Sequence, residues 1–417
     1  MNNYIVGIDI GASKICGVVG NLDSAGKLQV LGVTTSKCNG VRKSGVSDFE
    51  NTSNAIKDVV TQLGNIINTN IHGVYISIPV SLCGVIEKRE ILTLSSQDRE
   101  ITSEDIENLK ELIRLEVKQS TNKEVIKINL LEFKINDVGN INNPLGLLGK
   151  NLEVVSQVIV ASKEIVDLYK KPVEDIGIKV LGFTVDCLGV CKDTLSETDV
   201  QDGVAIIDIG AETSDVVIYI KNKLEYVASI GLGGDTITND IAICLKISKD
   251  DAESLKIKSG RIYKENIDIG EKIKIYSLKD GQTIEIDYVM LVEIIYERVK
   301  EIIKLIKEVL VDSGYYNQIK TVVLCGGGVS LYRGITDLIE KVVEKECRVV
   351  TPSYVGVANP IYTIATGIIK ELSLQLNNDI EKEADNKVVI QKDEQLKKNK
   401  DDIKFLSKFK AFLSDFF

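Results

Sequence analysis

Residues 4–11 of this chain read Tyr-Ile-Val-Gly-Ile-Asp-Ile-Gly, and residues 204–210 repeat the pattern as Val-Ala-Ile-Ile-Asp-Ile-Gly. Each stretch is a short apolar run rich in β-branched residues, which predicts a buried strand that ends at the glycine. A polar turn and a second apolar run follow each glycine, at 15–20 and at 216–220. A pattern that returns in both halves indicates an internal duplication, with one α/β domain in each half.

Two further segments complete the expected organisation. A third apolar run, residues 321–325, ends in three glycines and precedes a predicted helix at about 331–344. Between 84 and 162 the pattern changes to strand-like runs around one helix, which Thr102 or Ser103 would cap and whose first turn is acidic. We therefore expect a small α+β unit inserted into the first half.

Composition limits the classes of function. The 417 residues are 44% hydrophobic and 27% charged, which suits a water-soluble protein of two or more domains. A net charge of −10 argues against a nucleic-acid surface, so no nucleic-acid partner is expected. The eight cysteines and single histidine show no metal-ligand spacing, and small buried thiols are the better interpretation. Neither a signal-peptide pattern nor a run of roughly 20 apolar residues occurs, so the protein is expected to stay inside the cell.

The two Asp-Ile-Gly turns suit a phosphate site. Glycine lets backbone N–H groups approach phosphate oxygens, and an aspartate at a strand end can hold Mg²⁺, usually through its waters. The hydroxyls of Thr213 and Ser214 would add hydrogen-bond donors. One such turn is more often an ordinary strand end or polar hairpin, but two turns in a duplicated fold can face each other around one phosphate chain. The chain has neither a Gly-x-Gly-x-x-Gly fingerprint after its first strand nor a Gly-x-x-x-x-Gly-Lys-Ser/Thr loop.

Three motifs together resemble the two phosphate loops and the adenosine loop of the actin, sugar kinase and heat-shock chaperone superfamily: Asp9-Ile10-Gly11, Asp208-Ile209-Gly210 and Gly326-Gly327-Gly328. Within that superfamily the chain is most similar to the FtsA family of bacterial cell-division proteins. The stretches that carry this narrower resemblance are Arg99–Ile106, Asn143–Gly149 with Leu152–Val154, Gly231–Asp235, Thr238–Ala242 and Ala252–Lys256. The resemblance implies an α/β, actin-like duplicated ATPase fold with an inserted small α+β subdomain and a C-terminal amphipathic helix.

The resemblance also implies how the chain divides into domains. In chain order the parts are 1–83 (actin-like domain 1, first part), 84–162 (inserted subdomain), 163–201 (domain 1, continued), 202–235 (domain 2 core), 236–310 (domain 2 small subdomain), 311–372 (domain 2 core and return to domain 1), 373–402 (linker) and 403–417 (membrane-binding helix).

The same resemblance implies a site for ATP and Mg²⁺, in which Asp9 and Asp208 would organise the metal ion. The residues around the nucleotide would be Gly11, Ser13, Lys14, Gly210, Thr213 and Ser214 at the phosphates, Gly234, Glu253 and Lys256 toward the ribose and base, and Gly326, Gly327 and Gly328 against the adenine. On a helix, Glu253 and Lys256 would also form an i,i+3 pair, which is usually a solvated surface contact.

Departures from the family pattern bear on hydrolysis. Ala12 stands where a threonine is usual and lacks its hydroxyl donor, and Glu212 stands where a second glycine is usual. A carboxylate there could repel phosphate, or its backbone could reshape the turn. Asp186 lacks the usual Glu-Pro-x-Ala context and is the only candidate to orient an attacking water. The pattern therefore favours ATP binding with slow hydrolysis.

Residues 403–417 read Ile-Lys-Phe-Leu-Ser-Lys-Phe-Lys-Ala-Phe-Leu-Ser-Asp-Phe-Phe. At about 100° per residue, one helix face would carry Phe405, Leu406, Phe409, Phe412, Leu413, Phe416 and Phe417. An apolar stripe usually packs on a protein's own core. Here a polar linker separates the stripe from the folded body and lysines flank the aromatic residues, which favours a membrane interface instead.

These features predict an adaptor that binds ATP, self-associates and lies at the cytoplasmic face of the cell membrane. By resemblance it would tether the tubulin-like protein FtsZ there, at the division site, together with other division proteins. A sugar or acetate kinase is the enzymatic alternative, but it would need a second substrate pocket with a catalytic base and would not explain the terminal helix. A pilus-assembly adaptor that binds ATP is the other alternative, and the Asn-Pro-Leu-Gly segment at 143–146 with the terminal helix favours division.

Overall fold

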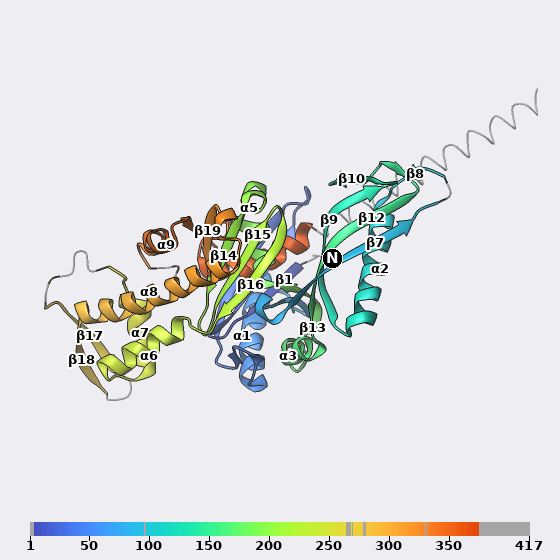
Figure 1. The fold of residues 1–417 in the computed structure, drawn as a ribbon. Helices are drawn as coiled ribbons and strands as arrows, with labels where there is room; N and C mark the ends of the chain where they lie inside the picture. The colour runs from blue at the N-terminus through green and yellow to red at the C-terminus, as the bar shows by residue number, and fades with distance from the viewer. Residues whose placement is uncertain are drawn as a thin grey trace, which may run out of the picture. The chain divides into compact units, whose positions relative to one another are not determined.

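Two five-stranded sheets with the same strand order form the body of the molecule (Figure 1). The computed structural model describes residues 4–95, 97–263, 268, 270–277, 281–328, 330 and 332–374. Residues 1–371 form one compact unit. A helix over 363–374 includes residues 373 and 374, which the sequence assigned to the linker, whereas the rest of the linker and the predicted membrane helix lie outside the described residues.

The first sheet has the order β13-β6-β1-β2-β3, with β1 antiparallel to β2 and parallel to β6. Its strands are β1 (Tyr4–Ile10), β2 (Lys14–Leu22), β3 (Leu28–Lys37), β6 (Gly73–Ile78) and β13 (Lys179–Val185). Helix α1 (Phe49–Ile67) packs against this sheet with its apolar face, and α3 (Lys163–Glu174) packs beside it. Gly17 permits the close approach of α1, because a Cβ atom at that position would collide with Val59.

The second sheet repeats the first. Its order is β20-β19-β14-β15-β16, with β14 antiparallel to β15 and parallel to β19. Its strands are β14 (Val204–Ile209), β15 (Ser214–Ile220), β16 (Lys223–Ile230), β19 (Thr321–Cys325) and β20 (Glu346–Val349). Helices α8 (Tyr288–Asp312) and α9 (Ile335–Val343) bury their apolar faces in the core of this half. The internal duplication predicted from the sequence is therefore confirmed.

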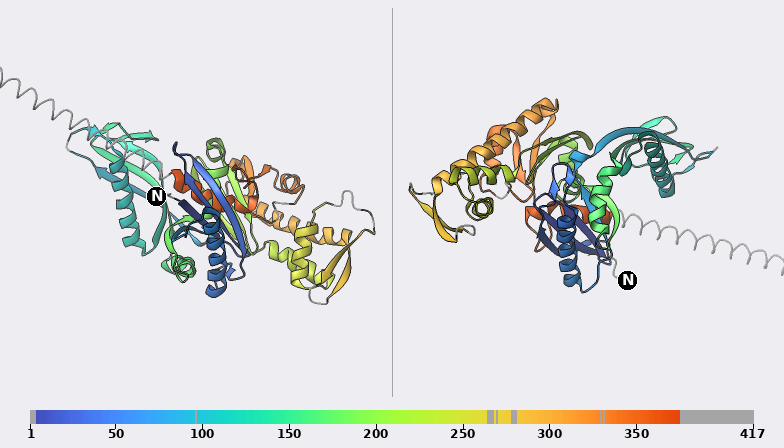
Figure 2. Two further views of the ribbon diagram at one scale, coloured as in Figure 1. Left: turned by 180° about the vertical axis from the view of Figure 1, so that it is seen from behind. Right: turned by 90° about the horizontal axis from the view of Figure 1, so that it is seen from below.

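A separate sheet with its own core forms the insert. Its order is β10-β9-β12-β7, and α2 lies against one face (Figure 2). The elements are β7 (Gly84–Thr93), β8 (Arg99–Glu100), α2 (Ser103–Thr121), β9 (Glu124–Ile135), β10 (Val138–Ile141), β11 (Leu148–Gly149) and β12 (Asn151–Ala161). Leu109, Ile113 and Val117 of α2 are fully buried against the sheet. This insert confirms the predicted small α+β unit.

The segment Arg99–Asp105 contains the residues that stabilise the start of α2. Thr102 is the N-cap, as one of the two predicted candidates, and it forms a capping box with Asp105. Arg99 donates to both carboxylate oxygens of Asp105, at 2.8 and 2.6 Å. The hydrogen bonds from Arg99 lower the pKa of Asp105 to about 2, against the opposing effect of burial.

We expect Asp105→Asn to destabilise α2 by about 1–3 kcal/mol, because the change removes the charge from a buried carboxylate that caps the helix and accepts two hydrogen bonds from Arg99. The folded-state pKa lies below the ordinary value of 3.8, so the contribution is present above that value and is lost as pH falls toward about 2. Hydrogen exchange of the α2 amides at neutral and acidic pH measures both effects. Glu111→Gln, which breaks only an exposed i,i+3 pair with Arg114, is the control and should change exchange little.

The second half carries a small subdomain between β16 and α8. It contains α6 (Gly234–Leu245), α7 (Lys249–Ser259), β17 (Lys272–Ser277) and β18 (Gln282–Asp287). Its helices α6 and α7 pack on each other, and α6 packs on α8. This arrangement places the start of α6 and one face of α7 next to the second Asp-Ile-Gly turn.

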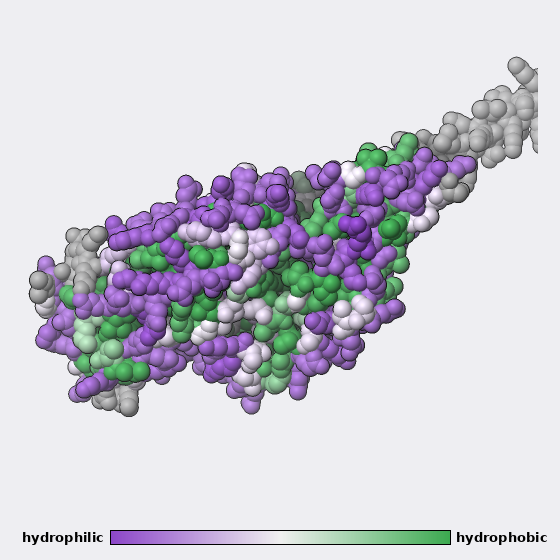
Figure 3. Space-filling view, in the orientation of Figure 1, coloured by the Kyte–Doolittle hydropathy of each residue, from purple (hydrophilic) through white to green (hydrophobic). Residues whose placement is uncertain are grey.

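Exposed apolar side chains occur on the insert and on other parts of the described surface. Figure 3 shows them interrupting a largely hydrophilic surface over the insert. Those of the insert that are most exposed are Ile91, Leu115, Val138, Leu145 and Leu148. The exposed apolar side chains of the insert mark one candidate contact surface for another protein. Within the described part of the chain, no helix has the length and apolar character that crossing a membrane requires.

Candidate functional site

The two Asp-Ile-Gly turns have matching geometry. In each, the glycine N–H donates to the carbonyl three residues on: Gly11 to Lys14 at 3.2 Å, and Gly210 to Thr213 at 2.9 Å. Asp9 and Asp208 stand at equivalent places near the ends of β1 and β14. After burial and Asp215, the charge of Asp9 also raises the pKa of Asp208, so the two predicted metal-organising carboxyls act on each other electrostatically.

Both carboxyls are partly buried, in an environment that would favour a cation. Ser77 donates to Asp9 at 2.8 Å, while Lys14 exerts an opposing charge on Asp9 and Asp208. Burial first, then Asp215 and Asp9, raises the pKa of Asp208 to about 7. Such a raised pKa means that the surrounding protein groups do not fully stabilise the negative charge of the carboxylate.

Asp215 is a third carboxyl at this site, and the sequence analysis did not assign it. It pairs across the hairpin with Asp208 and lines the same small cavity together with Asp186. One oxygen of Asp208 and one of Asp215 are buried without a hydrogen-bond partner. Asp215 could have been predicted from the sequence, because directly paired residues of an antiparallel hairpin point to the same face and Asp215 is the expected partner of Asp208.

The donor set fits a magnesium ion that completes its shell with phosphate oxygens and water. The unpartnered carboxylate oxygens of Asp208 and Asp215 are hard oxygen ligands, which suit Mg²⁺. In the described residues, no group of three or more His, Cys, Asp or Glu side chains is placed to hold a metal ion by itself. Mg²⁺ commonly relies on one or two carboxylates plus substrate phosphates, so the two observations agree.

The loop at Gly326–Gly328 closes the site from the second half. Gly326 has φ of +88°, which favours glycine, and a Cβ atom there would collide with Asp208. A Cβ atom at Gly327 would collide with the ammonium of Lys14 and with Ile361. Lys14, from the first half, therefore reaches the glycine loop of the second half, and bare backbone is required where the two meet.

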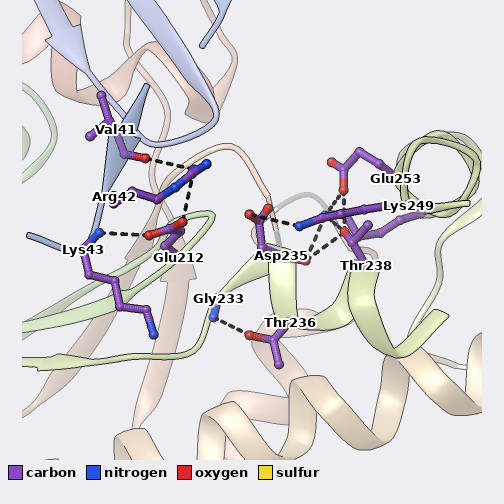
Figure 4. Close-up of polar contacts among 12 residues, drawn as sticks. Val41, Arg42, Lys43, Glu212, Gly233, Asp235, Thr236, Thr238, Lys249 and Glu253 are labelled. Carbon is purple, nitrogen blue, oxygen red and sulfur yellow. Dashed lines mark hydrogen bonds and ion pairs between the residues drawn. The ribbon is translucent and has the colours of Figure 1, made fainter. Parts of the chain in front are cut away.

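Glu253 and Lys256 form the predicted i,i+3 pair, at 2.7 Å, but the contact is not a solvated surface pair. The ammonium of Lys256 is 11% exposed and donates to the carbonyl of Gly234 at 3.0 Å and to Thr238 at 2.8 Å. Thr238 donates in turn to Glu253 (Figure 4). The helix pair α6–α7 thus holds three predicted site residues together, and Thr238 joins them.

The three predicted phosphate-loop hydroxyls lie in different surroundings. Ser13 is exposed and Thr213 is half-buried, so both can be reached. Ser214 is fully buried and donates to the carbonyl of Leu232 at 2.8 Å. As the first residue of β15, Ser214 directs its side chain into the protein. Its hydroxyl proton is engaged in the bond to Leu232 and is not available to donate to a phosphate.

Asp186 opens α4 (Asp186–Thr194) and is held by backbone donors. It accepts from the N–H of Val80 at 3.0 Å and of Cys187 at 2.6 Å. Burial, followed by the charges of Asp215 and Asp208, raises its pKa well above the ordinary value, which the two backbone hydrogen bonds only partly oppose. These contacts fix the carboxyl at the start of α4, beside the cavity that Asp208 and Asp215 also line.

Glu212 is engaged by the first half of the molecule. Its carboxylate accepts from the N–H of Lys43 at 2.9 Å and pairs with Arg42 at 3.3 Å (Figure 4). The guanidinium offsets its charge, which weakens the expectation that this carboxylate repels phosphate. Sequence reasoning did not find Arg42 or Lys43, since they lie in a short hairpin far from Glu212 in the chain.

Comparisons with known proteins agree with this architecture. The family model described as cell division protein FtsA matches residues 205–367, and that of the SHS2 domain inserted in FtsA matches residues 84–160. Cell division protein FtsA of Enterococcus faecalis is 30% identical over 376 residues, covering 89% of this chain and 84% of the relative. FtsA of Pseudomonas aeruginosa is 28% identical, with 88% of each chain covered.

Solved structures show the fold alone. A chain of the PilM-PilN type IV pilus biogenesis complex superposes with a TM-score of 0.57 at 16% identity, covering 89% of this chain and 98% of that one. MreB5 of Spiroplasma citri bound to ADP gives a TM-score of 0.51 at 12% identity, covering 90% and 99%. The actin-like fold class is confirmed.

Proposed function

The chain belongs to the FtsA family of cell-division proteins, and from that premise we propose that it binds ATP with Mg²⁺ between its two duplicated halves and tethers FtsZ to the cytoplasmic face of the cell membrane at the division site. The observation that carries the nucleotide part is the convergence of Lys14 from the first half and Asp208 from the second half on the glycine loop at Gly326–Gly328. Bound Mg²⁺ would neutralise phosphate charge, and the loop glycines would admit the nucleotide against backbone. MreB5, an actin-like neighbour, has been solved with ADP.

Self-association and contacts with other division proteins form the second part of the proposal. The exposed apolar side chains of the insert support it, because such a surface is suited to a protein partner. Val138 and Leu148 are the most exposed apolar side chains of the insert, at 66% and 64%, so within the insert they gain most from being covered.

Membrane attachment through residues 403–417 is the third part. A single amphipathic helix of this length is a marginal anchor, since interfacial burial must offset a folding cost of about 1 kcal/mol or more per residue. Many helices on one polymer act together, so assembly and attachment would reinforce each other.

ATP hydrolysis is expected to be slow. Ala12 lacks a hydroxyl, and Asp186 stands without the usual Glu-Pro-x-Ala context. Steady-state phosphate release should lie far below the ordinary enzyme rate of about 10 s⁻¹. Release at that rate or above, measured with a coupled phosphate assay and abolished in Asp208→Ala, would contradict this expectation.

Co-sedimentation with anionic liposomes tests the proposed function as a whole. FtsZ should pellet with the liposomes only when this chain and ATP with Mg²⁺ are present. A variant that ends at residue 402 should stay in the supernatant together with FtsZ. If FtsZ remains soluble while the full chain pellets, the tethering role is wrong, although the membrane attachment stands.

A further inference from the structure

A short hairpin of the first half contacts the second phosphate loop. The hairpin consists of β4 (Val41–Arg42) and β5 (Gly45–Val46) and lies between β3 and α1. At its tip, Arg42 and Lys43 meet Glu212, which lies between the glycine and the hydroxyl residues of the loop. Figure 4 shows Glu212 directed toward this hairpin.

Three contacts join the two segments. The carboxylate of Glu212 accepts from the backbone N–H of Lys43 at 2.9 Å, and its other oxygen lies 3.3 Å from the guanidinium of Arg42. The ammonium of Lys43 donates to the carbonyl of Gly231 at 2.6 Å. The carboxylate is 17% exposed and the guanidinium 51%, so the ion pair lies at the rim of the protein rather than in its core.

In the second half, the hairpin contacts the segments that form the proposed nucleotide site. The turn after Gly231 is hydrogen-bonded to the phosphate loop, with the N–H of Gly234 donating to Gly210 at 2.9 Å and that of Asp235 donating to Ala211 at 2.8 Å. Gly234 also accepts from Lys256. Phosphate loop, turn and α6–α7 pair are thus linked to one another at the place where the hairpin holds them.

On the first half, the hairpin is anchored beside the other phosphate loop. The N–H of Cys38, just before the hairpin, donates to the carbonyl of Ser13 at 3.0 Å. At the other end, the N–H groups of Ser47 and Asp48 donate to Gly40 at 2.8 and 2.9 Å, and Asp48 caps α1. The hairpin therefore connects the first phosphate loop to the second.

We propose that Arg42, Lys43 and Glu212 form a clasp across the nucleotide cleft, which must open before the nucleotide leaves. The proposal rests on the nucleotide site of the proposed function and deepens it, because it assigns residues that set how long the nucleotide stays. A glycine at position 212, as in the family pattern that the sequence resembles, has no side chain and could make neither carboxylate contact. The clasp is thus a property of this chain's own sequence.

The test is the release of a fluorescent ADP analogue, mant-ADP, from its Mg²⁺ complex after excess ATP is added, followed in a stopped-flow instrument. Arg42→Ala and Glu212→Gln each remove the ion pair, and each should speed release about fivefold, equivalent to about 1 kcal/mol. Glu212→Ala also removes the acceptor for Lys43 and should release faster still. The double variant Arg42→Ala/Glu212→Gln should release no faster than Glu212→Gln alone, since both changes break one contact.

A matched ion pair in the insert gives the control. Arg89 and Glu153 are also 3.3 Å apart, with exposed fractions of 70% and 19%. Arg89→Ala should release mant-ADP at the wild-type rate. Thermal unfolding of the nucleotide-free variants should match the wild type, which separates a clasp from a general loss of stability.

Salt supplies a second readout. An ion pair exposed at the rim is screened, so raising the salt concentration should accelerate release more in the wild type than in Glu212→Gln. Wild-type release rates and salt dependence in Arg42→Ala and Glu212→Gln would overturn the clasp while leaving the nucleotide site intact. If the wild-type chain holds no mant-ADP, the nucleotide site itself is wrong and the clasp falls with it.

Discussion

Adding ATP with Mg²⁺ should raise the melting temperature of the wild-type chain and leave that of Asp208→Ala unchanged. A ligand that binds only the folded state stabilises it by RT ln(1 + [L]/Kd), about 2.7 kcal/mol when its concentration is about 100 times Kd. Asp208 is one of two carboxyls at the site with an oxygen that is buried without a hydrogen-bond partner, and the charge of Asp9 acts on it. Losing it removes the metal-organising group, so the whole ligand-induced shift should disappear.

The nucleotide-free Asp208→Ala protein should be at least as stable as the wild type. The substitution removes a carboxyl that has one buried oxygen without a hydrogen-bond partner and whose ionised form is disfavoured by burial, Asp215 and Asp9. Asp167→Ala, on the exposed face of α3, is the control and should retain the full shift. An unchanged shift in Asp208→Ala would place the nucleotide elsewhere. Differential scanning fluorimetry with and without the ligands measures all three proteins.

The parts of the fold that were predictable are those fixed by local pattern. The apolar runs that end in Asp-Ile-Gly predicted two strands at equivalent positions, and the matching strand orders of the two sheets follow from that duplication. Thr102 could be named as a cap because Ser, Thr and acidic residues at a helix start satisfy its free N–H groups. The pairing of β1 with β6 and of β14 with β19 was not predictable in the same way, because no local signal fixes contacts between distant strands.

The same distinction applies to the site: residues in local motifs could be predicted, whereas contacts between distant segments could not. Asp9, Asp208 and the three glycines were found because glycine and aspartate at a strand end have few structural explanations when they occur twice. The partners of Glu212 were not found, since they come from a hairpin in the other half of the chain. The position of Ser214 was misleading for a simple reason: in a strand that is buried on both faces, a hydroxyl next to a loop points inward as readily as outward.

Phe409→Glu should release the protein from anionic liposomes and leave the ATP-induced rise in melting temperature intact. Phe409 lies near the centre of the predicted apolar face of residues 403–417. Full burial of one large side chain is worth about 1.5–3 kcal/mol, and a charge in its place must either enter the interface or rotate the helix out of it. A marginal anchor can tolerate neither.

Ser407→Glu adds the same charge to the polar face of the same helix and is therefore the matched control, expected to weaken pelleting much less. Replacing Lys404, Lys408 and Lys410 together should also weaken it less, and mainly at low salt, because basic residues near the surface contribute about 1 kcal/mol each and are screened. A different outcome is that Phe409→Glu protein has a lower melting temperature and still pellets with liposomes. The helix would then pack on the folded body, because a buried charge would destabilise the fold and leave lipid attachment unchanged. Release by Phe409→Glu but not by Ser407→Glu would show that one face of the helix, rather than its net charge, holds the chain on the membrane.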